Sequence, residues 1–453
     1  MQNKIKLYFD TMGCSKNLVD SEYALGRLRS FGFEPTADPF EAQVVVVNTC
    51  GFINDAKEES IERLLELAQL KEEGCLVLAA TGCLVQRYRE ELAAEIPEVD
   101  VWLGTEEYDR LPELLWAALG RMNRRLKPPA NCDDINCDDY NERLLLTPPY
   151  LAYLKIAEGC DNCCTFCAIP NIRGRLKSQP MERLLAEARR LREQGVQELC
   201  LIAQDTTAYG RDLTPDGRSL LAPLLRELAK LGFLWLRLLY AYPEGVDDEL
   251  LSVMRDCPSV CHYLDLPLQH VNHEVIRRMN RRLDRPQIEA LLAKIRSFLP
   301  DVALRSTFMV GFPGESEEDF QELLDFAAGA GLDWAGVFQY SPEEDTPAAL
   351  LPNQVPEEIK ARRYNQLMAV LADAGAARRE QMLGRRLTVL LEQPSLDFPG
   401  YFEARSAYHA PEVDGVIYVD NRDGALSERH IGHRAEVELL EAAAYDLIAK
   451  IVE

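Results

Sequence analysis

The sequence predicts an α/β protein built from an open parallel α/β domain, a partial TIM-like barrel of six βα units and a small all-β barrel. Strand and helix patterns alternate over residues 1–120 and again over residues 146–382, which is typical of parallel sheets. After residue 384 the pattern changes to short strands and turns, as in small β-barrels. A length of 453 residues also suits several domains better than one.

The first predicted domain, residues 1–120, alternates strands with amphipathic helices. Its strands are expected at Lys4–Phe9, Val44–Val47, Cys75–Ala79 and Val99–Leu103. Its helices are expected at Asp20–Phe31, Ala56–Leu70, Gln86–Ala94 and Tyr108–Leu119. Residues 121–145 contain Pro128-Pro129 and an acidic stretch without periodicity, so we expect a linker there.

The second predicted domain, residues 146–382, repeats a strand followed by a helical pattern. Its strands are expected at Tyr150–Ala157, Glu198–Ala203, Trp235–Tyr240, Tyr263–Leu266, Ala303–Val310 and Ala335–Gln339. Such a barrel carries its chemistry at the C-terminal ends of the strands. The long helix Glu357–Met382 closes the unit. The third domain, residues 384–453, has strands expected at Leu387–Glu392, Tyr401–Ala404, Gly415–Val419 and Ala435–Ala442.

The chain carries 50 Lys and Arg residues against 74 Asp and Glu residues, a formal net charge of −24. This excess of acid argues against broad binding to nucleic-acid phosphates and favours a basic partner. A hydrophobic content of 47% excludes a wholly disordered chain. No apolar stretch is long enough to cross a membrane and the N-terminus has no apolar leader-like region, so we expect a cytoplasmic protein.

Thirteen cysteines in a chain expected in a reducing compartment indicate metal binding or catalysis rather than disulfides. The strongest pattern is the CxxxCxxC spacing of Cys160, Cys164 and Cys167, directly after the first barrel strand. Three thiolates can hold three irons of a cubane iron–sulfur cluster and leave the fourth open to a chelating small molecule. The alternative, a structural zinc site, needs a fourth ligand. Cys163 could supply it only if adjacent side chains converged.

A second group consists of Cys14, Cys50 and Cys83, which are far apart in the sequence. Each lies in the loop that leaves a strand of the first domain. Such loops meet at one edge of a parallel sheet, so the three thiols could form another three-thiolate site. Chance placement is the alternative. Cys75 and Cys200 are expected in the core, and the Cys132/Cys137 pair of the linker is too weak a pattern to assign.

These motifs resemble those of the radical S-adenosylmethionine (SAM) methylthiotransferases over essentially the whole chain. The resemblance implies a radical SAM barrel, a C-terminal TRAM domain and two [4Fe-4S] clusters. The ligands that it implies are Cys160, Cys164 and Cys167 for the cluster that binds SAM, and Cys14, Cys50 and Cys83 for an auxiliary cluster. Cys163 departs from the family pattern, in which a non-cysteine residue is usual.

Within this family the chain is similar to the branch that modifies a ribosomal protein (RimO type). The similarity lies in Gly13-Cys-Ser-Lys-Asn17, Asn48-Thr-Cys-Gly-Phe-Ile-Asn-Asp-Ala-Lys-Glu-Glu-Ser60, Leu201-Ile-Ala-Gln-Asp-Thr-Thr207 and Ala410-Pro-Glu-Val-Asp-Gly415. The tRNA-modifying branch (MiaB type) typically reads Gly-Cys-Gln-Met-Asn at the first cysteine.

The resemblance implies methylthiolation of the β-carbon of an aspartate in the small-subunit ribosomal protein of the decoding centre. An electron from a reduced flavodoxin- or ferredoxin-type protein would cleave SAM to a 5′-deoxyadenosyl radical, which would take the β-hydrogen. A methylated sulfur at the auxiliary cluster would then be transferred, with a second SAM as the methyl source. A sulfur donor is a further implied partner, whereas neither a membrane nor tRNA is expected.

Side chains near the ends of the barrel strands are candidates to bind SAM. Phe166, beside the last cluster cysteine, could pack on the adenine ring. Gln204, Asp205 and Thr206 end the second barrel strand, and Arg305 lies within the fifth. Each of the five also has a structural interpretation, as barrel lining or as a turn residue.

Two other classes of function stay open at this point: the same chemistry on tRNA adenosine, and a non-enzymatic iron–sulfur or zinc protein. Residues 384–453 contain seven Lys and Arg residues against thirteen Asp and Glu residues. A tRNA-binding barrel should instead present a positive face. Acids such as Glu412, Asp414 and Asp420 are therefore expected to face a basic ribosomal protein.

Overall fold

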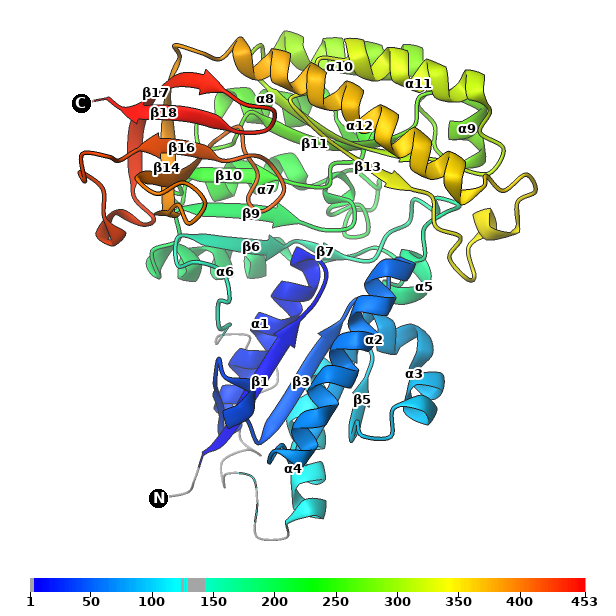
Figure 1. Cartoon of the computed structure of the whole chain (residues 1–453), viewed down its shortest axis with the longest axis vertical. Helices are drawn as coiled ribbons and strands as arrows, with labels where there is room; N and C mark the ends of the chain where they lie inside the picture. Colours follow the sequence, from blue (N-terminus) through cyan, green and yellow to red (C-terminus); the bar gives the residue numbers. More distant parts are fainter. Residues whose placement is uncertain (1–3, 124–125, 127, 129–142, 453) are drawn as a thin grey trace.

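The computed structural model describes residues 4–123, 126, 128 and 143–452, and it has the predicted architecture. An N-terminal parallel sheet, a partial parallel barrel and a closed β-barrel follow one another along the chain (Figure 1). Most of the predicted linker, together with Cys132 and Cys137, lies outside the described residues. No helix in the described part of the chain is long and apolar enough to span a membrane.

The N-terminal sheet has the strand order β2-β1-β3-β4-β5, and all its pairings are parallel. Its strands are β1 (Ile5–Thr11), β2 (Phe33–Pro35), β3 (Val44–Thr49), β4 (Val77–Gly82) and β5 (Val101–Leu103). Its helices are α1 (Ser15–Ser30), α2 (Asn54–Ala68), α3 (Cys83–Glu95) and α4 (Leu111–Met122). The central strands β3 and β4 are buried throughout because helices cover both faces of the sheet.

The partial barrel consists of two three-stranded parallel sheets that meet through a bridge between Leu236 and Val260. Its strands are β6 (Leu151–Lys155), β9 (Glu198–Ile202), β10 (Trp235–Leu238), β11 (Tyr263–Gln269), β12 (Ala303–Val310) and β13 (Trp334–Gln339). They stand in chain order, as successive right-handed βα units require.

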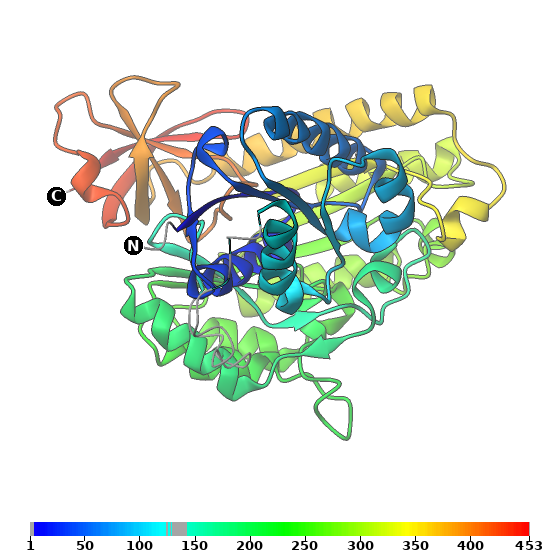
Figure 2. The ribbon, with the colours of Figure 1, turned by 90° about the horizontal axis from the view of Figure 1, so that it is seen from below.

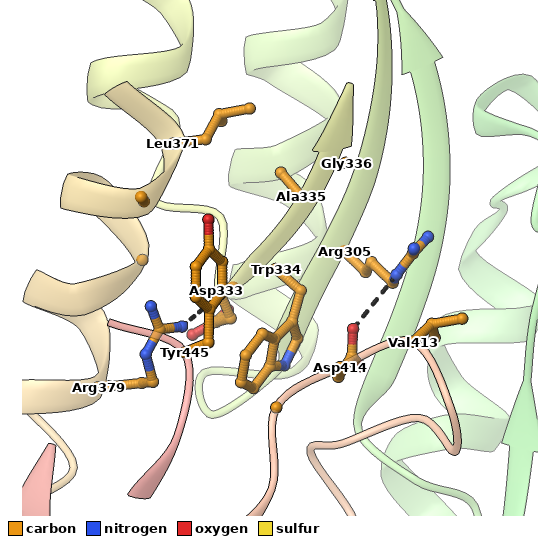
Figure 3. Close-up of a pocket in the computed structure, with 13 residues that line it drawn as sticks. Arg305, Asp333, Trp334, Ala335, Gly336, Leu371, Arg379, Val413, Asp414 and Tyr445 are labelled. Carbon is orange, nitrogen blue, oxygen red and sulfur yellow. Dashed lines mark hydrogen bonds and ion pairs between the residues drawn. The ribbon is translucent and has the colours of Figure 1, made fainter. Parts of the chain in front are cut away.

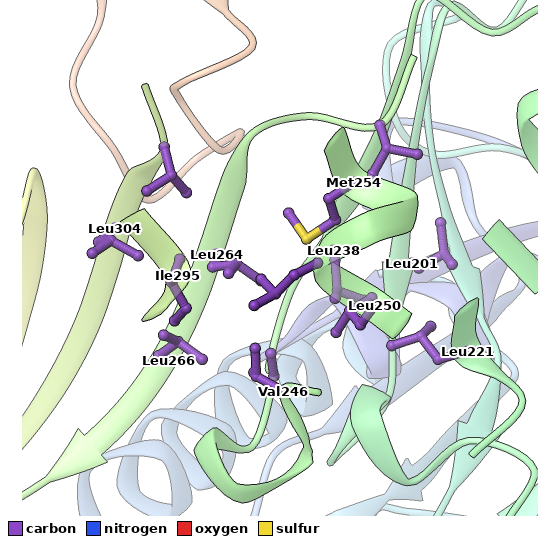
Figure 4. Packing of buried hydrophobic residues seen from close by; sticks show 14 of the residues in the cluster. Leu201, Leu221, Leu238, Val246, Leu250, Met254, Leu264, Leu266, Ile295 and Leu304 are labelled. Atoms are coloured by element: carbon purple, nitrogen blue, oxygen red, sulfur yellow. The ribbon is translucent and has the colours of Figure 1, made fainter. Parts of the chain in front are cut away.

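Helices cover the outside of this barrel. They are α6 (Met181–Glu193), α7 (Leu221–Ala229), α8 (Asp248–Asp256), α10 (Arg285–Phe298), α11 (Glu317–Gly329) and α12 (Glu357–Glu380). Leucines of the strands interlock with Leu250, Met254 and Ile295 of the helices in the largest core of the molecule (Figure 4). This packing fixes the strand ends that carry the site.

Short elements decorate the barrel near its first strand. A hairpin of β7 (Ala157–Glu158) and β8 (Lys177–Ser178) encloses the cysteine loop and α5 (Ile169–Arg173), and α9 (His273–Arg278) packs beside that loop. The predicted strand Tyr150–Ala157 is therefore divided into β6 and β7.

The C-terminal barrel is closed in the order β14-β15-β16-β18-β17. Its strands are β14 (Arg386–Pro394), β15 (Tyr401–Ser406), β16 (Ile417–Asp420), β17 (Arg434–Ala442) and β18 (Leu447–Ile451). The sequence pattern did not predict β18, which pairs with both β16 and β17 and completes the closure. Closure leaves the barrel without an exposed edge.

The N-terminal domain lies along one side of the partial barrel (Figures 1 and 2). Helix α1 contacts the edge strand β6. On the opposite edge, Glu343 follows β13 and forms ion pairs of 2.7 Å with Lys57 of α2 and 3.2 Å with Arg87 of α3. The domain therefore bridges both edges of the open barrel.

Candidate iron–sulfur and substrate site

The cysteine loop Cys160–Cys167 lies between β7 and α5 and is tied to the barrel by backbone hydrogen bonds. The Cys160 N–H donates to the carbonyl of Gly174, and the Thr165 N–H donates to that of Met279. Cys160, Cys164 and Cys167 are all partly buried. They lie close enough together that the charge of Cys164 raises the pKa of both Cys160 and Cys167. Burial raises the pKa of the Cys160 thiol to about 11 and that of Cys167 to about 12.

Cys163 differs from its neighbours. It is exposed, and its backbone has a left-handed φ of 51°. Its carbonyl accepts a hydrogen bond of 2.9 Å from the Asn280 side chain. Within the described residues, no three His, Cys, Asp or Glu side chains converge on the position of a single metal ion.

The second trio lies at the edge of the N-terminal sheet where β1, β3 and β4 end. Cys14 is the residue before α1, Cys50 follows β3, and Cys83 is the first residue of α3. Space between them is tight, since a Cβ on Gly13 would lie 2.8 Å from the Cys50 sulfur. Glycine also suits the φ of 88° at this position. The three thiols are thus adjacent, with a backbone that can approach a bulky cluster.

The thiols of this trio differ in their electrostatic surroundings. Burial raises the pKa of Cys83 to about 11 and also raises that of Cys50. Burial acts in the same direction on Cys14, but the positive charge of Lys16 and hydrogen bonds from the backbone N–H groups of the first turn of α1 outweigh it. The pKa of Cys14 is therefore lowered.

Arg173 joins the two cysteine sites. It ends α5, six residues after Cys167, and is 5% exposed. Its guanidinium donates to the side chain of Asn17, to Asp20 at 2.9 Å and to Glu158 at 3.0 Å. Asn17 in turn lies 3.6 Å from the Cys83 sulfur through its side-chain oxygen. One buried cation of the barrel therefore stands against the thiols of the N-terminal domain.

Three of the predicted SAM contacts lie at the C-terminal end of β9. The Gln204 amide donates to Glu158 at 2.7 Å, and its buried side-chain oxygen has no hydrogen-bond partner among the described residues. Asp205 accepts from Asn162 of the cysteine loop at 2.8 Å. The Thr206 hydroxyl donates to the carbonyls of Leu239 and Tyr240. Of the three, Gln204 keeps a free acceptor, whereas the other two are engaged within the protein.

Phe166 and Arg305 lie in different surroundings from these three. The Phe166 ring is 6.5 Å from that of Phe312, in a small apolar cluster. Arg305 is the third residue of β12, near the opposite end of the barrel. It forms ion pairs with Asp265 at 3.0 Å and Asp414 at 3.3 Å. The structure does not bring Arg305 to the cysteine loop, so its position does not support the predicted contact with SAM.

Arg305 instead lines a cavity of about 260 Å³ where the partial barrel meets the C-terminal barrel (Figure 3). Asp414, from the loop before β16, points at Arg305, and Trp334 lies beside them. The Asp414 side chain is fully buried and also accepts from the Tyr263 hydroxyl at 2.7 Å. The expectation that Asp414 faces a protein partner is therefore wrong, because this acid holds two domains together.

Sequence reasoning missed Lys16, Asn17, Arg173 and Tyr240, which link the two cysteine sites. Lys16 is 9% exposed, and its ammonium group lies 3.4 Å from the centre of the Tyr240 ring, which follows β10. For Lys16 and Asn17 the available signal was their place in the motif Gly13-Cys-Ser-Lys-Asn17, and for Arg173 it was proximity in sequence to Cys167. The sequence alone does not show that this lysine and this arginine are buried, because most charged side chains lie on the surface.

Comparison with known proteins agrees with this geometry. Residues 154–327 match the radical SAM superfamily, residues 383–452 match the TRAM domain, and residues 6–104 match an uncharacterized protein family, UPF0004. The solved structure of the radical SAM methyltransferase TsrM from Kitasatospora setae superposes with a TM-score of 0.54 at 14% identity, covering 77% of each chain. At that identity it shows the fold alone.

Curated relatives match nearly the full chain. The ribosomal protein uS12 methylthiotransferase RimO of Geobacter sulfurreducens is 45% identical over 453 residues, covering 99% of each chain. The RimO protein of Lachnoclostridium phytofermentans is 45% identical over 446 residues, covering 98% of this chain and 99% of its own. Identity of this extent over nearly the full length of both chains shows that the chain belongs to the RimO family of the radical SAM superfamily.

Proposed function

We propose that this chain is a radical SAM methylthiotransferase that modifies the β-carbon of an aspartate in ribosomal protein uS12. The names of the curated relatives support the reaction and the substrate protein. The observation that carries the proposal is the presence of two three-cysteine sites on adjoining domains, linked by the buried guanidinium of Arg173. One site can serve radical formation and the other can serve sulfur transfer.

The proposed cofactors are SAM and two [4Fe-4S] clusters, and the residues present fit them. The proposed ligands are Cys160, Cys164 and Cys167 for one cluster and Cys14, Cys50 and Cys83 for the other. When bound, these groups supply the one-electron chemistry that acts on a C–H bond beyond the reach of acid–base groups. Such chemistry also calls for a reduced flavodoxin- or ferredoxin-type partner and for a sulfur donor.

The side chains around the cysteines have positioning roles. Asp205 fixes the cysteine loop through Asn162, and its other oxygen accepts from the N–H groups of Thr207 and Ala208. The free oxygen of Gln204 is the best-placed acceptor for a polar group of SAM. Phe166 can close the apolar side of the same region. These groups would hold SAM in one orientation and exclude water from it.

We assign the auxiliary site to residues 1–120, radical formation to residues 146–382 and substrate contact to residues 384–453, with residues 121–145 as the connection. Modification of a ribosomal protein would also place the enzyme in the cytoplasm. The acidic balance of residues 384–453 supports a basic protein substrate over tRNA, whose phosphates call for a positive surface.

Mass spectrometry of uS12 and of tRNA from a deletion strain tests the proposal. We expect the methylthio group to disappear from one aspartate of uS12 and to return when the gene is restored. The tRNA adenosines should be unchanged. Loss of a methylthio group from tRNA with uS12 unaffected would assign the chain to the other substrate.

A further inference from the structure

Lys16 is a buried cation beside the auxiliary cysteines. It lies in the first turn of α1, two residues after Cys14, and its side chain packs its ammonium group over the Tyr240 ring at 3.4 Å. Tyr240 follows β10 at the C-terminal end of the barrel. The ammonium group therefore stands between the auxiliary site and the barrel mouth, where a radical SAM substrate must enter.

Lys16 has no carboxylate partner within ion-pairing distance in the described part of the chain. The nearby cations differ in this respect, since Arg173 and Lys155 both pair with Asp20 and Glu158. Arg379, another buried cation without a carboxylate, donates instead to three backbone carbonyls. A buried charge is strongly unfavourable unless it is paired. Within the protein the partners of the Lys16 ammonium group are the Tyr240 hydroxyl and the Cys14 thiol. It has no carboxylate of its own in the described residues, so a ligand can supply one.

The ring under Lys16 is held in a constrained conformation. Tyr240 has a φ of 57°, which is rare for a residue other than glycine. Its backbone N–H donates to Asp265 at 3.1 Å, and its carbonyl accepts from the N–H of Thr206 at 3.1 Å. Such strain persists only where the surroundings impose it, and it is common at ligand-binding positions. The platform that orients the ammonium group is therefore fixed before any ligand arrives.

We propose that Lys16 binds the side-chain carboxylate of the substrate aspartate and selects aspartate over uncharged residues. This inference rests on the proposed function. The β-carbon to be modified is bonded directly to the carboxylate carbon, so a carboxylate held by Lys16 places that β-carbon beside Cys14 and the auxiliary site. A charge-assisted hydrogen bond from this buried ammonium group would give both affinity and orientation.

The test is a double-mutant cycle on binding. The partners are the cluster-loaded full chain, either wild type or Lys16→Met, and labelled uS12 carrying either the modified aspartate or asparagine there. Mass spectrometry of the wild-type product identifies that aspartate. We expect the wild-type enzyme to bind the aspartate form roughly 10- to 100-fold more tightly than the asparagine form. The Lys16→Met enzyme should bind both forms within about twofold, and Lys16→Arg should restore part of the preference.

Three measurements separate this inference from other outcomes. Turnover of uS12 by the wild-type enzyme reports on the proposed function independently of the cycle. Lys6→Met removes an exposed lysine of the same domain and should keep the full preference for aspartate. Equal weakening of both uS12 forms by Lys16→Met, or no preference in the wild type, would overturn the inference. So would an unchanged preference with a shifted reduction potential of the auxiliary cluster, because Lys16 would then act as the counter-ion of that cluster.

Discussion

At the residue scale, the structure distinguishes side chains that look alike in the sequence. Cys163 and Cys164 are neighbours, yet one is exposed with a left-handed backbone and the other is partly buried. The CxxxCxxC spacing alone identified Cys164 as the ligand candidate. What the spacing could not show is the polar environment, because Arg173, Asn17 and Lys16 reach the cysteines only through the contact between two domains.

The first prediction concerns Cys163. Cys163→Ser should leave the iron content and the rate of SAM cleavage within about twofold of the wild type, because an exposed side chain on the outside of the loop is no ligand. Iron analysis and quantification of 5′-deoxyadenosine measure both. Loss of iron from this variant would show that Cys163, rather than Cys164, binds the cluster.

The second prediction concerns Arg173. Arg173→Met leaves Asp20 and Glu158 with Lys155 as their remaining cation, in a buried network. We expect the free energy of unfolding to fall by about 3–5 kcal/mol, as when one partner of a buried pair is removed. Urea unfolding measures it. The matched control is Arg175→Gln, whose side chain is 87% exposed and which should change stability by less than about 0.5 kcal/mol. Equal effects of the two variants would contradict a structural role for the network.

At the element scale, the sequence predicted most helices and strands but misplaced some ends. The helix expected from Asp20 begins at Ser15, and the helix expected from Gln86 begins at Cys83. Glycine and small polar residues near the cysteines suggested loops, whereas the structure places both cysteines at helix starts. At Cys14 the backbone N–H groups of the first helical turn stabilise the thiolate, whereas burial keeps the pKa of Cys83 raised. Short strands such as β2 and β18 gave too few residues for a periodicity.

The segment Arg405–Asp414 closes the N-terminal end of the partial barrel. Arg405 pairs with Glu198 at 2.8 Å, Arg237 donates to the carbonyls of Ser406 and Ala407, and Trp334 donates to that of Tyr408. In the sequence this segment followed the expected strand Tyr401–Ala404 and contained part of the Ala410–Gly415 motif, without any periodicity. Arg405 and Asp414 are buried and pair with Glu198 and Arg305 of the partial barrel, and no local pattern reports such pairing.

The third prediction concerns His409 in this segment. Burial, together with the charges of Arg237 and Arg405, lowers its pKa to about 3, against about 6.5 in an unfolded chain. Between these values the unfolded chain binds a proton that the folded chain does not. The free energy of unfolding should therefore fall with decreasing pH below about 6.5, with about 1.4 kcal/mol per pH unit due to His409.

Urea unfolding of His409→Gln and of the wild type between pH 5 and 7 tests this pH dependence. The range lies between and around the folded and unfolded pKa values of His409, where its contribution changes with pH. The variant should lose stability less steeply as the pH falls. His270, whose pKa burial also lowers to about 3, is present in both proteins and contributes equally. His433→Gln, at an exposed position, should follow the wild-type curve. Parallel curves for wild type and His409→Gln would contradict the buried, neutral state of His409.

At the scale of the whole molecule, the N-terminal domain spans both edges of the open barrel, and the C-terminal barrel closes its base. The sequence predicted the three folds and both cysteine trios, because periodicity and cysteine spacing are local or repeat regularly. It did not predict how the domains meet. That arrangement depends on ion pairs such as Glu343 with Lys57, whose partners are hundreds of residues apart.

The fourth prediction separates the two cysteine sites. Cys160→Ala should abolish SAM cleavage, because its loop belongs to the barrel. Cys14→Ala should keep uncoupled SAM cleavage but abolish methylthiolation of uS12, because its loop belongs to the N-terminal sheet. Chromatography of 5′-deoxyadenosine and mass spectrometry of uS12 measure the two steps. Methylthiolation at the wild-type rate by Cys14→Ala would show that the auxiliary site is wrongly assigned.

The last prediction concerns the face of the C-terminal barrel that meets the substrate. Asp414 is buried, and the exposed Glu412 accepts a hydrogen bond of 3.5 Å from the Tyr153 hydroxyl at the domain junction, so changing either would also disturb the contact between domains. The surface charge of this barrel is tested at three exposed acids, Asp423, Glu428 and Glu436. Replacing all three by Lys should weaken binding of uS12 roughly tenfold and reduce its dependence on salt, because complementary charge speeds encounter.

The same charge change on α3, made by Glu90→Lys, Glu91→Lys and Glu95→Lys, is the control and should have a smaller effect on uS12 binding. Equal weakening by both triple variants would indicate an effect of total charge alone, and a gain of tRNA binding with uS12 binding unchanged would favour the RNA substrate.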